Sequence, residues 1–203
     1  MAGILLAAGE GSRLGQPKAL VEIGGQSLVS RGIALLRAGG AAPVIVVTGA
    51  AGAGLTGVIT VRNPDWRTGM GSSLIAGLRV IPASCDAAVI ALVDQPLIGP
   101  EAVHRLIAAR ASGAGAAVAA YGGQPRNPVL LGREHWPEVI SLAAGDAGAR
   151  RFLRAHPELV TVVECGDTGR PDDIDTPADL ERITAELAAR GRPAAPPASS
   201  GPA

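Results

Sequence analysis

Short apolar runs alternate with segments of helical periodicity along most of the chain. The runs are apolar throughout instead of alternating with polar residues, so we expect strands buried on both faces. The predicted strands cover residues 3–7, 43–48, 58–61, 87–93, 115–120, 127–131 and 159–164. The predicted helices cover residues 27–38, 72–81, 100–111, 134–142, 147–155 and 176–190. This order predicts an α/β protein with a three-layer α/β/α, Rossmann-like fold and a mainly parallel sheet.

The same pattern sets the expected domain boundaries. Residues 1–190 are predicted to form one domain, in which a subregion of about 122–156 extends or caps the sheet. Residues 191–203 are rich in Pro, Ala and Ser and contain no apolar run, so we expect them to be disordered.

Composition narrows the classes of partner. Aromatic residues make up only 2% of the chain and its formal net charge is zero. We therefore expect no nucleic-acid partner, because base stacking needs aromatic platforms and phosphates need a basic surface. No apolar run approaches the roughly 18 residues of a membrane span. Cys85 and Cys165 lie far apart outside any C-x-x-C pattern, which is typical of reduced thiols. The first apolar run lacks a basic leader, so we expect a soluble cytoplasmic protein.

The loop after the first predicted strand holds Lys18, the only lysine beside many arginines. In an open parallel sheet this loop lies at the edge where ligands bind. Its glycines, Gly9, Gly11 and Gly15, let backbone amides approach an anion, and Arg13 adds positive charge. An ammonium is a compact donor for one phosphate oxygen, whereas guanidinium is a planar fork. The loop therefore predicts phosphate binding, although a plain turn is the alternative.

Two familiar phosphate-binding patterns are absent from this loop. Lys18 stands between Pro17 and Ala19, which excludes G-x-x-x-x-G-K-[ST], and the third glycine comes one place too late for G-x-G-x-x-G. No acidic residue closes the second predicted strand, where a dinucleotide ribose would need one.

Carboxylates occur at two places that the fold would bring to the same edge. Asp94 ends the strand at 87–93, and Asp172, Asp173 and Asp175 precede a Thr-Pro helix start. Asp94 could simply cap a turn, and the later group could be solvated loop acids, with Asp175 assisting the helix N-terminus. Alternatively, two aspartates share a Mg²⁺ ion, which takes one or two carboxylates plus phosphate oxygens.

The three histidines show no evident partners. His104 and His135 lie in predicted helices and His156 directly follows one, and we expect surface or packing roles for all three.

The chain resembles nucleotidyltransferases related to molybdenum cofactor cytidylyltransferase. The segment LAAGEGSRLGQPK at residues 6–18 is similar to that family's L-A-A-G-x-[GS]-x-R-x-G-x-x-K signature. Five further segments follow in the family's order: NPDWRTGMGSSLIAGL at 63–78, LVDQPLI at 92–98, RNPVLL at 126–131, GDAGARRFL at 145–153 and DIDTPADL at 173–180. The resemblance covers nearly the whole chain except the tail and implies the nucleotidyltransferase version of the fold.

The resemblance implies a role for each matching residue. Lys18, Arg13 and Asp94 would be catalytic, with Lys18 on the α-phosphate. The metal ligands would be Asp94 and Asp175, with Asp173 in reserve. The nucleotide-binding residues would be Leu6, Ala7, Ala8, Gly9, Gly11, Ser12, Arg13, Gly15, Lys18, Asn63, Gly69, Ser73 and Asp94, with Gly69 and Gly71 letting backbone approach the nucleoside. From the local sequence alone, the alternative for the segment at Asn63 and Ser72 is a loop followed by a helix that Ser72 caps. The acceptor-binding residues would be Asn127, Pro128, Gly145 and Asp146.

The implied reaction is Mg²⁺-dependent transfer of CMP from CTP to the phosphate of molybdopterin, with release of pyrophosphate. The L-A-A-G loop favours CTP over GTP, and a molybdenum hydroxylase could receive the product. Three alternatives remain: the same chemistry with GTP or another phosphorylated acceptor, an NAD(P)H-dependent oxidoreductase on a Rossmann-like sheet, and a non-catalytic chaperone. The failed dinucleotide pattern counts against the second, and the intact Lys18, Asp94 and Asp175 count against the third.

Overall fold

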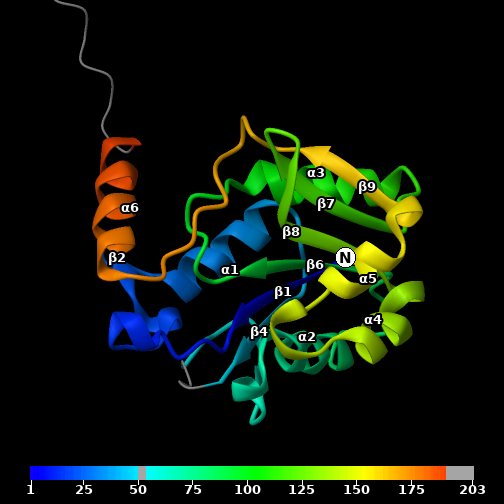
Figure 1. Cartoon of the computed structure of the whole chain (residues 1–203), viewed down its shortest axis with the longest axis horizontal. Helices are drawn as coiled ribbons and strands as arrows, with labels where there is room; N and C mark the ends of the chain where they lie inside the picture. The colour runs from blue at the N-terminus through cyan, green and yellow to red at the C-terminus, as the bar shows by residue number, and fades with distance from the viewer. Residues whose placement is uncertain (50–53, 191–203) are drawn as a thin grey trace, which may run out of the picture.

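A computed structural model describes residues 1–49 and 54–190 of the chain, so the predicted disorder of 191–203 lies outside the described residues. A seven-stranded sheet runs through the middle of the molecule (Figure 1). From edge to edge its strands are β5 (Ile59–Arg62), β4 (Val44–Thr48), β1 (Ala2–Ala7), β6 (Ala87–Leu92), β8 (Gln124–Gly132), β7 (Ala116–Tyr121) and β9 (Val160–Glu164).

The sheet is mainly parallel, as predicted. β1 pairs in parallel with β4 and β6, β4 with β5, and β7 with β9. Only β8 runs antiparallel, to both β6 and β7. The carboxyl ends of β1 and β6 therefore meet at one edge, which is where the loops after these strands gather.

Helices cover both faces of the sheet, which confirms the three-layer prediction (Figure 1). The α-helices are α1 (Leu28–Ala38), α2 (Met70–Arg79), α3 (Pro100–Ala111), α4 (Trp136–Leu142), α5 (Arg150–Ala155) and α6 (Pro177–Arg190). Core residues of α1, α3 and α6 pack on one face, and those of α2, α4 and α5 pack on the other.

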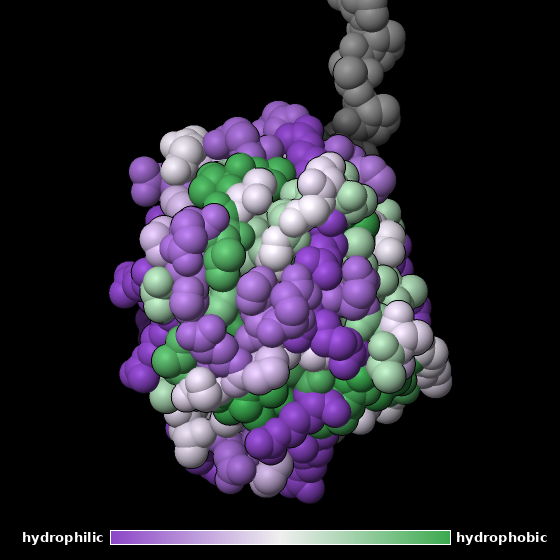
Figure 2. All heavy atoms as spheres, turned by 90° about the vertical axis from the view of Figure 1, so that its right-hand side faces the viewer, coloured by the Kyte–Doolittle hydropathy of each residue, from purple (hydrophilic) through white to green (hydrophobic). Residues whose placement is uncertain are grey.

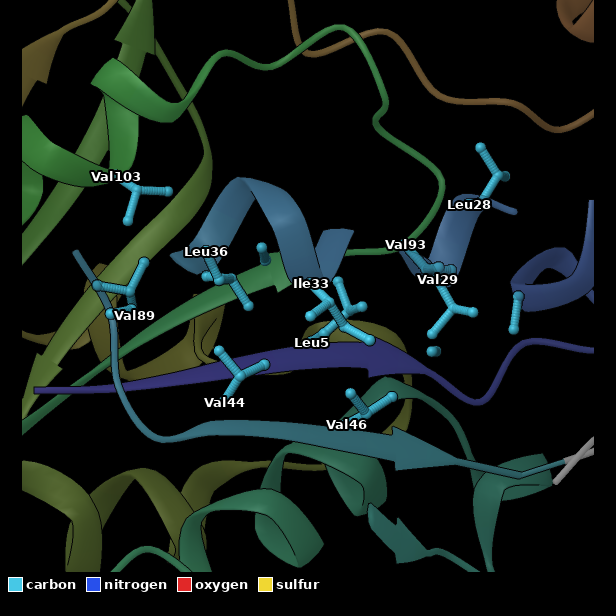
Figure 3. Close-up of a cluster of buried hydrophobic side chains, with 14 of the residues drawn as sticks. Leu5, Leu28, Val29, Ile33, Leu36, Val44, Val46, Val89, Val93 and Val103 are labelled. Carbon is cyan, nitrogen blue, oxygen red and sulfur yellow. The ribbon is translucent and has the colours of Figure 1, made fainter. Parts of the chain in front are cut away.

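Alternate residues of the central strand β1 pack into the hydrophobic cores on the two faces of the sheet. Leu5 packs with Ile33 and Leu36 of α1 on one face (Figure 3), whereas Ile4 joins the cluster that contains Leu74 of α2 on the other. Both β1 side chains have no exposed surface. Each buried side chain of this size contributes about 2–5 kcal/mol to the stability of the folded protein. The well-packed central strands therefore hold the edge of the sheet that carries the site in a fixed position.

Several local features differ from the predictions: β8 begins at Gln124, three residues before the predicted start, and α5 begins at Arg150, three residues after it. A hairpin of β2 (Glu22–Ile23) and β3 (Gln26–Ser27) was not predicted, because two residues are too short to show a period. Helix α2 begins at Met70, before the expected start, so the prediction that Ser72 is its cap is wrong. The Ser72 hydroxyl instead donates from within the first turn to the carbonyl oxygens of Asp65 (3.0 Å) and Gly69 (2.9 Å).

Single turns of 3₁₀ helix fill several connections. They are η1 (Ser12–Leu14), η2 (Lys18–Leu20), η3 (Trp66–Thr68), η4 (Arg133–His135), η5 (Gly145–Ala147) and η6 (Pro157–Leu159). Cys85 and Cys165 are buried free thiols, as predicted. Across residues 1–49 and 54–190, none of the helices combines the length and the apolar character needed to cross a membrane.

Candidate active site

The loop after β1 turns back toward the sheet through Gly11. This glycine has a φ of 65°, and an added Cβ would lie 2.0 Å from the backbone oxygen of Gln16, so no other residue fits without moving the loop. The turn ends in η2, where the Leu20 amide donates to the Pro17 carbonyl oxygen over 2.9 Å. Lys18 is the first residue of η2 and is thereby held at the carboxyl edge of the sheet.

Lys18 joins two aspartates from distant parts of the chain. Its Nζ lies 2.6 Å from Oδ2 of Asp94, which follows β6, and 2.5 Å from Oδ1 of Asp175, which precedes α6. Nη2 of Arg13 lies 3.6 Å from Oδ2, the other carboxylate oxygen of Asp175. The Lys18 and Asp94 side chains are only 15% and 18% exposed, so their attraction is screened less than that of a surface pair.

The backbone fixes this meeting of the two aspartates. The amide of Ile174 donates to the carbonyl oxygen of Asp94 over 2.9 Å, which ties the segment before α6 to the end of β6. The start of α6 is capped by its own residues: the amide of Thr176 donates to Oδ2 of Asp179 (2.9 Å), and the amide of Asp179 donates to the Thr176 hydroxyl (3.2 Å). The Asp175 carboxylate is thus left to bind cations, not to cap the helix.

Neighbouring charges and burial shift the pKa of Lys18 in opposite directions. Partial burial lowers the pKa of its ammonium, but the charges and hydrogen bonds of Asp94 and Asp175 outweigh burial and raise the pKa above its ordinary value. Lys18 therefore stays charged at neutral pH.

Asp173 lies beside this cluster but has a different partner. Its Oδ1 accepts a hydrogen bond of 2.9 Å from Nε2 of Gln95. Desolvation of its carboxyl group, together with the charge of Asp94, raises the pKa of Asp173. The structure thus brings Asp175, and not Asp173, onto Lys18 with Asp94.

A cavity of about 770 Å³ opens above this cluster. Ten of the thirteen expected nucleotide-binding residues line it: Leu6, Ala8, Gly9, Gly11, Ser12, Arg13, Lys18, Gly69, Ser73 and Asp94. Among the described residues, the lining omits Ala7, Gly15 and Asn63. Asn63 is only 3% exposed and acts on the cavity indirectly, since its Nδ2 donates to the hydroxyl of Ser73 over 3.0 Å.

Gly69, which lines the first cavity, also packs against Gly145. Its φ is 112°, and an added Cβ would lie 2.3 Å from the carbonyl carbon of Gly145, while one on Gly71 would lie 2.8 Å from the amide nitrogen of Ala144. These glycines therefore let the chain's own segment at 143–145 approach α2. This tertiary contact has no counterpart in the local sequence pattern.

Trp66 is a functional residue that the sequence pattern does not predict. It lines the first cavity, and the guanidinium of Arg67 stacks on its ring at 4.4 Å from the centroid. The sequence feature that could have indicated this role is an aromatic residue in a glycine-rich segment, in a chain that has few aromatic residues.

A second cavity, of about 920 Å³, adjoins the first. Both are lined by Asp94, Asp175 and Asp146, so the carboxylates stand at the boundary between them. Of the expected acceptor-binding residues, Asn127 and Asp146 line the second cavity; within the described part of the chain, Pro128 and Gly145 do not.

The expectation that the histidines lack partners is wrong for two of them, since Nε2 of His135 lies 3.9 Å from Oε1 of Glu134 and His156 has two acidic neighbours. Nε2 of His156 lies 2.8 Å from Oε1 of Glu138, and its Nδ1 lies 3.4 Å from Oε1 of Glu158. His156 and His135 also pack against the ring of Phe152. His156 sits beyond α5, outside both cavity linings, so the packing role holds.

The residues present fit a divalent cation. Oδ2 of Asp94 and Oδ1 of Asp175 already converge on one positive centre, the Lys18 ammonium. No group of three or more His, Cys, Asp and Glu able to hold a metal occurs in 1–49 and 54–190. Two carboxylates nevertheless suffice for Mg²⁺ when substrate phosphates and water complete its coordination.

Known proteins match this chain over most of its length. A nicotine blue oxidoreductase from Paenarthrobacter nicotinovorans is 38% identical over 195 residues, which cover 89% of this chain and 95% of that protein. A molybdenum cofactor guanylyltransferase from Rhodobacter capsulatus is 31% identical over 208 aligned positions, covering 92% of this chain and 96% of that protein.

Solved structures share the fold. The crystal structure of a homologue of Mycobacterium tuberculosis Rv0371c, from Mycobacterium sp. strain JC1, matches with a TM-score of 0.80 and 31% identity, covering 93% of this chain and 97% of that one. Rv0371c in complex with manganese matches with a TM-score of 0.74 at 24% identity, covering 91% and 97%, which supports the fold alone.

The MobA-like NTP transferase domain matches residues 3–160, a stretch that includes Lys18 and Asp94. The chain therefore belongs to the MobA-like NTP transferase family and carries that family's nucleotidyltransferase domain.

Proposed function

We propose that this protein transfers CMP from CTP to the phosphate of molybdopterin and releases pyrophosphate. The observation that carries the proposal is the convergence of Lys18, Asp94 and Asp175 at the boundary between two cavities. A transfer between two bound substrates needs the reacting phosphorus at such a boundary, with a nucleotide on one side and an acceptor on the other.

The first cavity accommodates the triphosphate. The amides of loop residues 8–13 and the guanidinium of Arg13 would bind the β- and γ-phosphates, because these residues lie on the cavity wall. Trp66 offers a flat surface for the base on the same wall. The L-A-A-G sequence at residues 6–9 supports cytosine by resemblance.

Charge neutralisation accounts for the chemical step. A phosphate oxygen of the acceptor attacks the α-phosphorus in line, a P–O bond forms, and the bond to the leaving pyrophosphate breaks. A phosphate monoester is already a nucleophile, so no catalytic base is needed. The Lys18 ammonium would donate to an α-phosphate oxygen as negative charge builds there.

Asp94 and Asp175 would hold the divalent cation, with Asp173 as the alternative to Asp175. When bound, Mg²⁺ would neutralise phosphate charge and orient the α-phosphate. Rv0371c, whose structure shares this fold, was solved in complex with manganese, and a divalent ion in this chain is part of our proposal.

The test is pyrophosphate release from the purified protein with Mg²⁺, molybdopterin and either CTP or GTP. We expect release with CTP and little with GTP. Release with GTP alone would mean that the protein transfers GMP instead of CMP. The 31% identity to a molybdenum cofactor guanylyltransferase makes this the nearest alternative. Release only with sugar or alcohol phosphates would replace molybdopterin as the acceptor.

A different class of activity also has a specific observation in its favour. The 38% identity to a nicotine blue oxidoreductase supports reduction of a dye-like substrate by NAD(P)H. The loop at residues 6–18 lacks the dinucleotide pattern, and Lys18 with two aspartates is suited to a metal-bound triphosphate. Oxidation of NADPH by this protein with nicotine blue, together with no pyrophosphate release, would select that activity.

A further inference from the structure

The second cavity extends well beyond the reacting carboxylates. Its floor includes Leu92 of β6, Val129 of β8, Val118 of β7 and Val162 of β9, which are successive strands of the sheet. Neighbouring strands lie about 4.8 Å apart, so the floor spans about 14 Å. Asp94 stands at the β6 end, and the β9 end is therefore too distant for the phosphate that reacts there.

Two arginines line the cavity from α5, which precedes β9. Arg150 and Arg154 are four residues apart, so they share one face of this helix. Both are exposed, and neither forms an ion pair with any residue that the structure describes. By contrast, Arg105 and Arg110 are tied to Asp167 and Glu134, respectively.

A third arginine reaches the cavity from the sheet. Arg126 of β8 lines it too, and its guanidinium donates to the carbonyl oxygen of its neighbour Pro125 over 3.2 Å. Guanidinium groups without a carboxylate partner retain their full capacity to bind an anion. Figure 2 shows that hydrophilic side chains, with hydrophobic ones between them, cover much of the face that lies to the right in Figure 1, where α5 and β9 are found.

We infer that Arg150 and Arg154 form an anion subsite for the far end of the acceptor, on the assumption that the proposed function is correct. The acceptor class is then an elongated molecule with a reacting phosphate, an apolar or aromatic middle and a second anionic group. The middle lies over Val118 and Val129, and the second anionic group meets the arginines.

Two dyes of the same shape test the subsite without catalysis. 1-Anilinonaphthalene-8-sulfonate carries an aromatic body and one anionic group, and N-phenyl-1-naphthylamine lacks the anionic group. Fluorescence titrations would compare the full-length wild-type protein, the double variant R150A/R154A and the matched control R151A, since Arg151 is exposed on α5 but does not line the cavity.

We expect the double variant to bind the sulfonate dye about tenfold more weakly than wild type and the neutral dye equally well. R151A should bind both dyes like wild type. Equal binding of the sulfonate dye by R150A/R154A and R151A would overturn the subsite.

Transfer kinetics separate this inference from the proposed function. R150A/R154A should raise KM for molybdopterin and leave KM for CTP unchanged, and a rise in KM for CTP alone would contradict the subsite. If the wild type releases no pyrophosphate with any triphosphate, the proposed function fails, whereas the dye titrations still decide whether the arginines bind an anion.

Discussion

Lys18 Nζ donates to Oδ2 of Asp94 over 2.6 Å, across 76 positions of sequence. The lysine that the chain retains among its arginines therefore neutralises a carboxylate at the end of a central strand. The same ammonium also reaches Asp175, which makes it the common partner of the two proposed metal ligands.

Replacement of Lys18 by arginine tests why a lysine stands there. The planar guanidinium is longer and does not fit the point between Asp94 and Asp175. We expect K18R to lower kcat by about 10²-fold or more, because one donor to the developing charge is misplaced. The Kd for CTP should change by less than about fivefold, because the loop amides still bind the other phosphates.

Pyrophosphate release and equilibrium binding of CTP measure the two effects. R79K is a suitable control, since Arg79 ends α2 and lines neither of the two cavities. Full activity of K18R would mean that the position tolerates any cation.

Metal binding in the absence of nucleotide tests whether the Asp94 and Asp175 carboxylates form one cation site. Because Lys18 already occupies the point between Asp94 and Asp175, Mn²⁺ has to displace it. We expect K18M to bind Mn²⁺ about tenfold more tightly than wild type. D94N and D175N should weaken binding, and the control D86N should not. Electron paramagnetic resonance of free Mn²⁺ gives each Kd.

The same titration discriminates between the two candidate ligands near α6. Oδ1 of Asp173 already accepts a hydrogen bond from Gln95, so D173N should weaken Mn²⁺ binding less than D175N does. The reverse order would assign the second ligand to Asp173.

The cap of α6 is predicted to stabilise the protein. Thr176→Ala removes the hydroxyl that accepts from the Asp179 amide, and we expect the free energy of unfolding to fall by about 1 kcal/mol. Urea denaturation measures this loss, with T161A on the exposed edge strand β9 as the control. An unchanged midpoint for T176A would show that Pro177 and the packing of α6 hold the helix start by themselves.

His156 is predicted to titrate above the ordinary range. The hydrogen bond that His156 donates to the Glu138 carboxylate outweighs desolvation and, with Glu158, raises the pKa of His156. Because the folded-state pKa is raised, the pair stabilises the fold fully below about pH 6.5, and its contribution is lost as the pH rises through the folded pKa. Titration by NMR should give a lower pKa for His156 in E138Q than in wild type, and equal values would show that the pairing is not formed.

Much of the fold was predictable because its strongest signals are local. The runs that became β1, β4 and β6 are apolar throughout, which marks buried parallel strands, and their boundaries differ from the prediction by one residue. The β2–β3 hairpin was missed because its strands have two residues each. The start of α2 was missed because it depends on Gly69 approaching Gly145.

The site was predictable to the extent that topology determines it. Loops after parallel strands share one edge, so Lys18 and Asp94 were expected to lie near each other, and they do. The direct contact of Lys18 with both aspartates was not predicted, because it depends on the Asp94–Ile174 backbone hydrogen bond. The role of Trp66 in the cavity wall depends likewise on packing between distant segments.

The most direct test of the central claim is mass spectrometry of the acceptor after incubation with CTP, Mg²⁺ and the wild-type protein. Nucleotidyl transfer at Lys18, Asp94 and Asp175 predicts molybdopterin whose mass has increased by one CMP unit, with pyrophosphate in equal amount. D94N should give none of this product. An acceptor of unchanged mass with both CTP and GTP, from protein that binds triphosphate, would contradict the account.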